Sequence, residues 1–272
     1  MTDLSTNSWG KSSVRVSKIH RGQDADDFSE VTVSVALTGD VEAAYVNADN
    51  VGVLPTDTVR NTTYALAQDN LTKDLEAFAE VLATHFLGHA GVDSVTVDLV
   101  EHLWRRQTES GFIGGSAERR TARRRAAADA AQVWGGIEGL MVLKTRESAF
   151  SGFPRDQYTI LPETDDRILA TTVGAEWLYA PVPADTTAAW EAVRAGLVGG
   201  FFGDWSGSIQ HQGWQMAEAV MAAVPEIAEL SVRLPNQHHL AYDLSRFEVE
   251  DKGIVFQSTS EPYGDIRFTV TR

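Results

Sequence analysis

The stretch Val31-Thr-Val33-Ser-Val35-Ala-Leu37 alternates large apolar residues with small or polar ones. A period of two is typical of a β-strand with one face buried and the other exposed. The same alternation recurs in Val95-Thr-Val-Asp-Leu99 and in Ile266-Arg-Phe-Thr-Val270. These three stretches predict a fold built on sheets with one covered face.

The segment between the first two of these stretches has a helical period. Leu75, Phe78, Leu82 and Phe86 follow the i, i+3, i+7, i+11 spacing of an amphipathic helix. Thr72 is a suitable N-cap residue for it. We therefore expect this helix to cover the apolar face of the first strands.

The second half of the chain repeats this order. Strand patterns at 140–144 and 168–173 precede two helical patterns, and strand patterns at 230–234 and 239–244 follow them. Two strands, helices and two further strands, twice over, predict a duplicated α+β unit with mainly antiparallel sheets and helices on one face. We place the boundary at Gly135-Gly136, which predicts units 1–135 and 136–272. The two helical patterns run through Trp190, Val193 and Leu197, then Ile209, Met216 and Val220.

Composition narrows the function classes. The 272 residues include no cysteine, which excludes disulfides, iron-sulfur clusters and cysteine-based zinc sites. The formal net charge of -15 disfavours nucleic acid and anionic membranes as partners. The polar start lacks a secretory signal pattern, no apolar run could span a bilayer, and the end carries no Ser-Lys-Leu, so we expect a cytoplasmic protein.

One region departs from the acidic average. Five arginines lie between Arg119 and Arg125, close to Arg105 and Arg106. A nucleic-acid patch is one interpretation, but alanines rather than aromatics lie between these cations, which favours a solvated strand or helix face. Local propensity at 126–131 favours a helix, whereas the duplicated order requires a strand there, and this conflict stays open.

Two further motifs have weak functional interpretations. His85 and His89 have the spacing of a zincin pair but lack the glutamate after the first histidine, which favours core or boundary histidines. Gly199-Gly-Phe-Phe-Gly203 follows a helix pattern and lacks the Lys-Ser/Thr ending of a phosphate loop, which favours a helix terminus and turn.

Phe150 and Arg167 lie in one short stretch and together suit a planar anion. The aromatic ring offers a stacking face, and the guanidinium pairs bidentately with adjacent acceptors. By itself the pair is more typical of a core phenylalanine and a surface arginine in a salt bridge than of a ligand site. Lys11 before the first strand, Thr56 or Asp57 as a helix cap, and Asn236 in a turn linking two strands have similarly ordinary interpretations.

Taken together, these motifs closely resemble the urate oxidase (uricase) family. The resemblance rests on Trp9-Gly-Lys-Ser-Ser-Val-Arg15, Pro55-Thr-Asp-Thr58 with Asn61-Thr62, Asp166-Arg-Ile168, Ser208-Ile-Gln210 and Leu234-Pro-Asn236 with His238. It implies two tandem tunnelling-fold units per chain and a barrel-like homotetramer with active sites between chains. It also implies oxidation of urate by O2 to 5-hydroxyisourate and H2O2, in purine catabolism, with neither metal nor organic cofactor.

The resemblance also implies a role for each site residue. Arg167 and Gln210 would hold opposite edges of the purine, and Phe150 would stack beneath it. Leu161 would wall the pocket, and the backbone at Asp57 and Ile209 would meet the remaining polar edge. Lys11 and Thr56 from a neighbouring chain, with His238 behind them, would form a proton relay, and Asn236 with Thr56 would bind O2.

The departures from the family pattern are modest, and two other functions stay open. Trp9, Arg146, Ile209 and Gln237 stand where tyrosine, a small hydroxyl residue, valine and lysine are usual. The alternatives are another tunnelling-fold purine or pterin enzyme, such as a cyclohydrolase or aldolase, and a purine-binding oligomer without catalysis.

Overall fold

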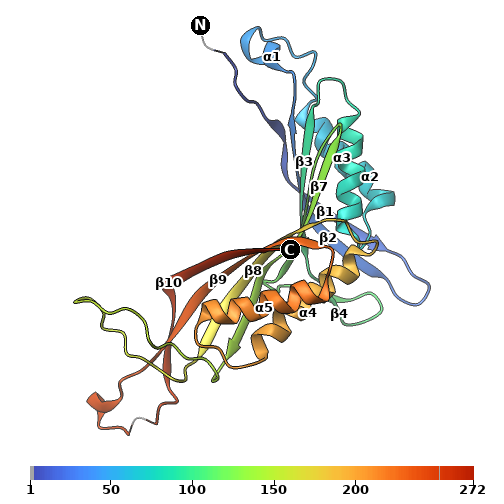
Figure 1. The fold of residues 1–272 in the computed structure, drawn as a ribbon. Coiled ribbons are helices and arrows are strands. Elements are labelled where there is room, and N and C mark those ends of the chain that lie inside the picture. Colours follow the sequence, from blue (N-terminus) through green and yellow to red (C-terminus); the bar gives the residue numbers. More distant parts are fainter. Residues whose placement is uncertain (1–2, 251) are drawn as a thin grey trace. The chain divides into compact units, whose positions relative to one another are not determined.

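The computed structural model describes residues 3–250 and 252–272 (Figure 1). The chain forms two compact units. Unit 1 extends to Ile137 and includes Trp177–Trp190, whereas unit 2 comprises Glu138–Glu176 and Glu191–Arg272. Among the described residues, no helix is long and apolar enough to cross a membrane.

Unit 1 is an antiparallel sheet covered by helices. Its strand order is β1-β2-β3-β6-β7, with β4 and β5 forming a separate pair. Val33, Val35 and Leu37 on β2 pack with Phe78 and Leu82 on α3, and all five are buried. The strands are β1 (Trp9–His20), β2 (Asp27–Thr38), β3 (Ser94–His102), β4 (Arg105–Arg106), β5 (Phe112–Ile113), β6 (Arg119–Ala127) and β7 (Ala130–Lys144), and the helices are α1 (Glu42–Val46), α2 (Thr56–Asn70) and α3 (Leu75–Leu87).

Unit 2 has the strand order β7-β8-β9-β10, and α5 packs against β9 and β10. A Cβ added to Gly200 of α4 would lie 2.5 Å from the Cα of Met216 on α5. A glycine is therefore required where these two helices cross closely. The elements are β8 (Leu169–Tyr179), α4 (Thr186–Phe202), α5 (Ile209–Ala223), β9 (Ile227–Ala241), a short 3-10 turn (Ser245–Phe247) and β10 (Phe256–Thr271).

The predicted α+β class with antiparallel sheets is confirmed, and so is the expected helix terminus at Gly199–Gly203. The conflict at 126–131 is resolved in favour of strands. Ala126 and Ala127 pair with β3, and Ala128-Asp129 make the turn into β7. Cross-strand pairing thus outweighs the local helix propensity of alanine.

Three local predictions were wrong. The segment from Leu234 to His238 does not link two strands, because β9 is continuous and pairs with β10 on both sides of an irregularity between Thr259 and Gly264. Lys11 lies within β1, which begins at Trp9, rather than before the first strand. The N-cap of α3 is Asp74, whose carboxylate accepts a hydrogen bond from the Ala77 amide, and not Thr72.

The arginine-rich stretch is one strand, β6, with two kinds of side chain. Arg123 and Arg124 pair with Asp98 and Glu80 at its surface. Arg120 is only 2% exposed and donates to Glu76 at 2.6 Å. The stretch is therefore partly a structural ion-pair cluster, not a wholly solvated face.

Candidate active site

A bulge in β1 decides which way Lys11 faces. Lys11 lies opposite Val35 and Val14 lies opposite Val33, so β1 carries one more residue than β2 between these pairs. Directly opposite residues of an antiparallel pair share a face, and Val33 and Val35 are both buried. The extra residue therefore places Lys11 on the helix-covered face, although its spacing from Val14 in a regular strand would put it on the other one.

The same end of unit 1 carries Thr56 and Asp57. The Trp9 indole donates to the Leu54 carbonyl at 3.1 Å and ties the start of β1 to the segment that enters α2. Thr56 is the first residue of α2 and is exposed, so its hydroxyl is available to a ligand. Asp57 is also exposed and pairs with Arg60 at 2.7 Å. The predicted capping role is wrong for both residues, because Pro55 is the N-cap and no side chain caps it.

In unit 2, Phe150 and Arg167 lie against one another. The Arg167 guanidinium carbon is 5.3 Å from the centroid of the Phe150 ring, and Phe153 stacks on that ring at 4.8 Å. Phe150 and Thr164 exchange backbone hydrogen bonds of 2.8 and 3.0 Å, which bring the two ends of the loop together. The expected aromatic and guanidinium pair is therefore present.

The Arg167 guanidinium is partly buried without a compensating charge. Among residues 3–250 and 252–272, no carboxylate forms an ion pair with it, and its buried Nε has no hydrogen-bond partner. Burial lowers the pKa of Arg167. A partly buried cation without a charged partner favours an anion as its ligand, and the adjacent ring favours a flat one.

Backbone bonds bring Phe150 close to the start of α5. The Ala149 amide donates to the Ser206 carbonyl at 2.8 Å, and the Ser206 amide donates to the Glu147 carbonyl at 3.0 Å. Ser208 caps α5 by accepting from the His211 amide, so Ile209 and Gln210 lie in its first turn. The amides of a first helical turn have no intrahelical acceptor, and they suit a polar or anionic ligand edge. Ile209 is buried and Gln210 is exposed.

Asn236 and His238 lie on β9, two residues apart, and so share one face of the sheet. Both are half-buried. Gln237 lies on the opposite face, where its amide donates to the Thr172 hydroxyl at 2.8 Å. Gln237, which stands where lysine is usual, therefore links the neighbouring strands β9 and β8 by a side-chain hydrogen bond.

Asp166 and Lys144 support the site, a role that the sequence alone does not indicate for either residue. The Asp166 carboxylate accepts hydrogen bonds from the Glu147 amide at 2.6 Å and the Ser148 amide at 3.4 Å. Glu147 has a φ of 67°, a left-handed conformation that is rare outside glycine. Lys144 is 8% exposed and donates to the Asp204 carbonyl at 3.4 Å, and burial lowers its pKa. Both residues brace the segments that carry Phe150 and the start of α5.

The predicted site residues thus form two groups. Lys11, Thr56 and Asp57 belong to unit 1. The second group, in unit 2, comprises Phe150, Leu161, Arg167, Ile209, Gln210, Asn236 and His238. Leu161 is half exposed in the loop between Phe150 and Arg167, and its carbonyl accepts from Arg155 at 3.2 Å.

A uricase family model matches residues 7–130 and 133–267. The chain belongs to the uricase family. It is 38% identical to a uricase of Arthrobacter globiformis, over 99% of this chain and 90% of that one. It is also 33% identical to a uricase of Dictyostelium discoideum, over 100% and 98% of the two chains. The crystal structure of the Arthrobacter globiformis uricase superposes with a TM-score of 0.96 at 37% identity, covering 100% of this chain and 96% of that one.

These comparisons confirm the resemblance inferred from the motifs. They also place the antiparallel α+β fold among solved uricases. The family model covers all ten predicted site residues.

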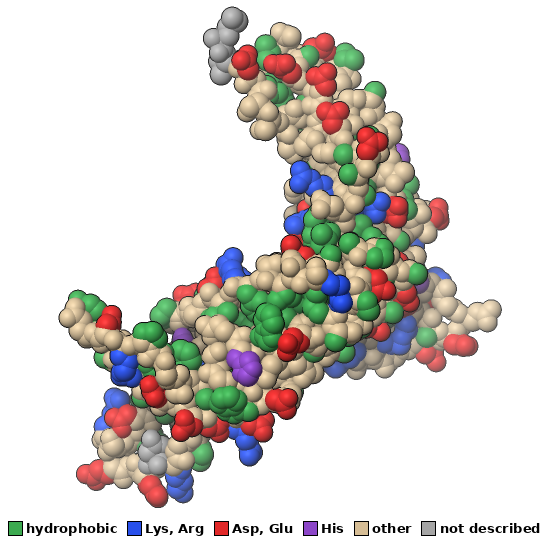
Figure 2. Space-filling model, in the orientation of Figure 1, with side chains coloured by type: hydrophobic (Ala, Val, Ile, Leu, Met, Phe, Trp, Pro, Cys, Tyr) green, Lys and Arg blue, Asp and Glu red, His purple; other side chains and the backbone are tan. Residues whose placement is uncertain are grey.

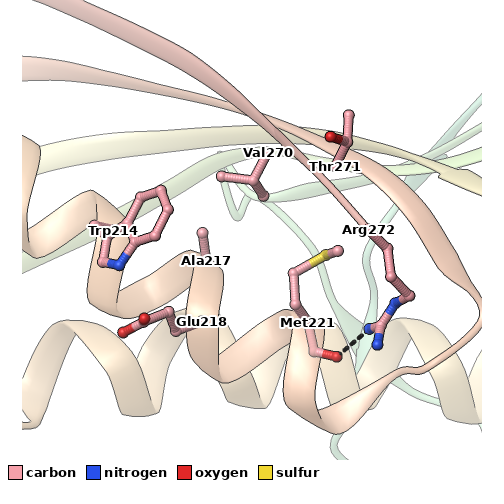
Figure 3. A pocket seen from close by; sticks show the side chains of 7 residues that line it. All are labelled: Trp214, Ala217, Glu218, Met221, Val270, Thr271 and Arg272. Carbon is pink, nitrogen blue, oxygen red and sulfur yellow. Dashed lines mark hydrogen bonds between the residues drawn. The ribbon is translucent and has the colours of Figure 1, made fainter.

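A separate cavity of about 270 Å³ lies between α5 and the end of β10. None of its seven lining residues belongs to the predicted site. Figure 3 shows Arg272 donating to the Met221 carbonyl at the end of α5, so its charge caps a helix C-terminus. Trp214, which is 51% exposed, also lines the cavity. Figure 2 shows hydrophobic side chains gathered over α5.

Proposed function

We propose that this uricase homologue oxidises urate with O2 to 5-hydroxyisourate and H2O2, without a metal or organic cofactor, in purine breakdown. The observation that carries the proposal is the partly buried Arg167 guanidinium, which has no carboxylate partner among the described residues and lies against the Phe150 ring. Urate is a flat anion with adjacent acceptors, and this pair suits it in shape and charge. A cytoplasmic location is part of the same proposal.

Substrate binding is assigned mainly to unit 2. Arg167 binds one edge of the purine bidentately, and the Gln210 amide binds the opposite edge through its donor and acceptor. Phe150 stacks on the ring and Leu161 closes the side of the pocket. The backbone at Ile209 and Asp57 meets the remaining polar edge.

Proton transfer is assigned to Lys11, Thr56 and His238. O2 in its triplet ground state reacts slowly with closed-shell molecules, but an electron-rich urate dianion can transfer one electron first. The enzyme must therefore remove a proton from bound urate. Threonine alone is too weak a base, so Lys11 accepts the proton through the Thr56 hydroxyl, and the His238 imidazole passes it onward.

Oxygen is assigned to Asn236 and Thr56, whose polar groups bind O2 and later peroxide or water beside the ring. Two electrons and two protons pass from urate and water to O2, which leaves as H2O2, while a hydroxyl group adds at C5. An amide such as that of Asn236 is costly to bury unless a ligand occupies its site.

The assembly proposed is a homotetramer of chains with two tandem tunnelling-fold units each, 1–135 and 136–272. Its active sites combine Lys11 and Thr56 of one chain with the unit 2 residues of a neighbour. The division of the site residues between the two units supports this arrangement, because each unit presents an incomplete set.

The decisive experiment follows urate absorbance, O2 uptake and peroxide release together in buffer treated with a chelator. We expect all three to proceed in equal molar amounts. Urate binding without O2 uptake would instead support the purine-binding oligomer, and activity that returns only with added metal would support another tunnelling-fold enzyme.

Asp166 provides a test of how the substrate grip is positioned. Asp166→Ala leaves two amides without their acceptor and releases the left-handed turn at Glu147. A hydrogen bond to a charged group contributes about 1.5–3 kcal/mol, so its loss should loosen the segment that carries Phe150. We therefore expect KM for urate to rise roughly tenfold or more, with a smaller change in kcat. Asp166→Asn keeps one acceptor oxygen, so its KM should lie between those of the unchanged protein and Asp166→Ala. Equal KM values in all three proteins would remove Asp166 from this role.

A further inference from the structure

His85 and His89 form a close pair at the end of α3. Their Nε2 atoms are 3.4 Å apart, and their ring centroids are 5.2 Å apart. His85 is exposed and His89 is half-buried, so a small ligand can reach the space between the two rings. His85 lies in the last turn of α3, which ends at Leu87, and His89 lies just beyond it, where its amide donates to the Phe86 carbonyl at 3.1 Å and turns the chain back toward His85.

The separation of the two nitrogens matches the bite of a tetrahedral metal. Imidazole nitrogens lie about 2.0–2.1 Å from Zn²⁺, and two such ligands at the tetrahedral angle are about 3.3–3.4 Å apart. The pair therefore needs almost no rearrangement to chelate the ion. A hydrogen bond between one protonated and one free Nε2 is the alternative reason for the contact.

Phe86 holds both rings in place. It is fully buried, and its ring lies edge-on to His85 at 5.3 Å and nearly parallel to His89 at 6.4 Å. An imidazole packed on a fixed aromatic has fewer rotamers to lose on binding. The site is therefore preorganised on one face.

Electrostatics favours a cation here. His85 lies in the last turn of α3 and His89 just beyond it, where the helix dipole attracts positive charge, and the chain carries a net charge of -15. Imidazole ligands suit zinc, copper and nickel rather than magnesium or calcium.

We propose that His85 and His89 form a surface site for a divalent transition metal such as zinc, completed by water. It is not a zincin centre, because the sequence between the histidines provides no general base. Among the described residues, no group of three or more potential ligands surrounds a common point, so the protein provides only these two. The site fastens the last turn of α3 to the segment that follows it, and it is independent of urate oxidation.

The test is calorimetric titration of Zn²⁺ into protein that has been stripped with EDTA, at pH 7.5. The pair provides two of the four protein ligands of a structural zinc site. Half of the binding free energy of such a site corresponds to a Kd of roughly 1–200 µM, and we expect a Kd in this range at one ion per chain. The matched variants are His85→Gln and His89→Gln, with His211→Gln as a control at an exposed histidine on α5. Mg²⁺ serves as the control ion.

The two single variants should each weaken Zn²⁺ binding by roughly a hundredfold, because the second imidazole no longer binds intramolecularly. His211→Gln should bind as tightly as the unchanged protein. Zinc should also raise Tm in the unchanged protein and not in His85→Gln. Binding that survives in both variants, or no binding at all, would leave the pair as a histidine-histidine hydrogen bond.

Discussion

Lys11→Met is expected to lower urate turnover by about 100-fold to 10,000-fold, the range that general acid-base groups contribute. Methionine keeps a similar length and apolar stem but cannot accept a proton. The fold should persist, because Lys11 makes no ion pair among the described residues. The bulge that orients Lys11 is held by a hydrogen bond of 3.0 Å from the Ser13 amide to the Ser34 hydroxyl. Stopped-flow loss of urate absorbance, with O2 in excess, measures the effect.

Lys18→Met provides a matched control. Lys18 lies on the same strand, beyond the bulge, and donates to the Leu71 carbonyl at 2.8 Å. This substitution should lower stability slightly and leave turnover nearly unchanged. Urate affinity, measured without O2, should change less than turnover in Lys11→Met. Near-normal turnover in that variant would exclude lysine from proton transfer.

The fold was predictable where the apolar period is strong. The alternating residues of β2 and the helical period through Phe78 and Phe86 fixed the class correctly, because both patterns follow directly from burial of one face. The continuous β9 was missed, since Pro235 reads as a break. Its pairing with Asp265 on β10 is a long-range contact that no local pattern reveals.

The site was predictable as a set of residues but not as a geometry. Motif order identified Lys11, but only the bulge against β2 shows that it faces the helices. Asp166 stands out in the sequence only as the neighbour of Arg167, and its hydrogen bonds with the Glu147 and Ser148 amides span a loop. A positive φ at a glutamate leaves no signal in a single sequence.

Arg167→Lys is the second large expected effect, and it concerns binding rather than chemistry. Lysine keeps the positive charge but loses the planar fork that pairs with two acceptors at once. A charge-assisted hydrogen bond contributes about 1.5–3 kcal/mol, so losing one should raise the Kd for urate about 10-fold to 150-fold. Titration in O2-free buffer measures that Kd without turnover.

Arg155→Lys is the matched control for this second prediction. The Arg155 guanidinium also lies over a phenylalanine, at 5.6 Å from the Phe153 ring, but it is exposed and donates to loop carbonyls. If cation-ring stacking alone held urate, both substitutions would weaken binding to a similar degree. If bidentate hydrogen bonds from a partly buried guanidinium hold urate, only Arg167→Lys should weaken urate binding. Arg167, unlike Arg155, has a buried Nε without a hydrogen-bond partner. A Kd unchanged by Arg167→Lys would mean that charge without geometry is sufficient, and the purine edge would then need another partner.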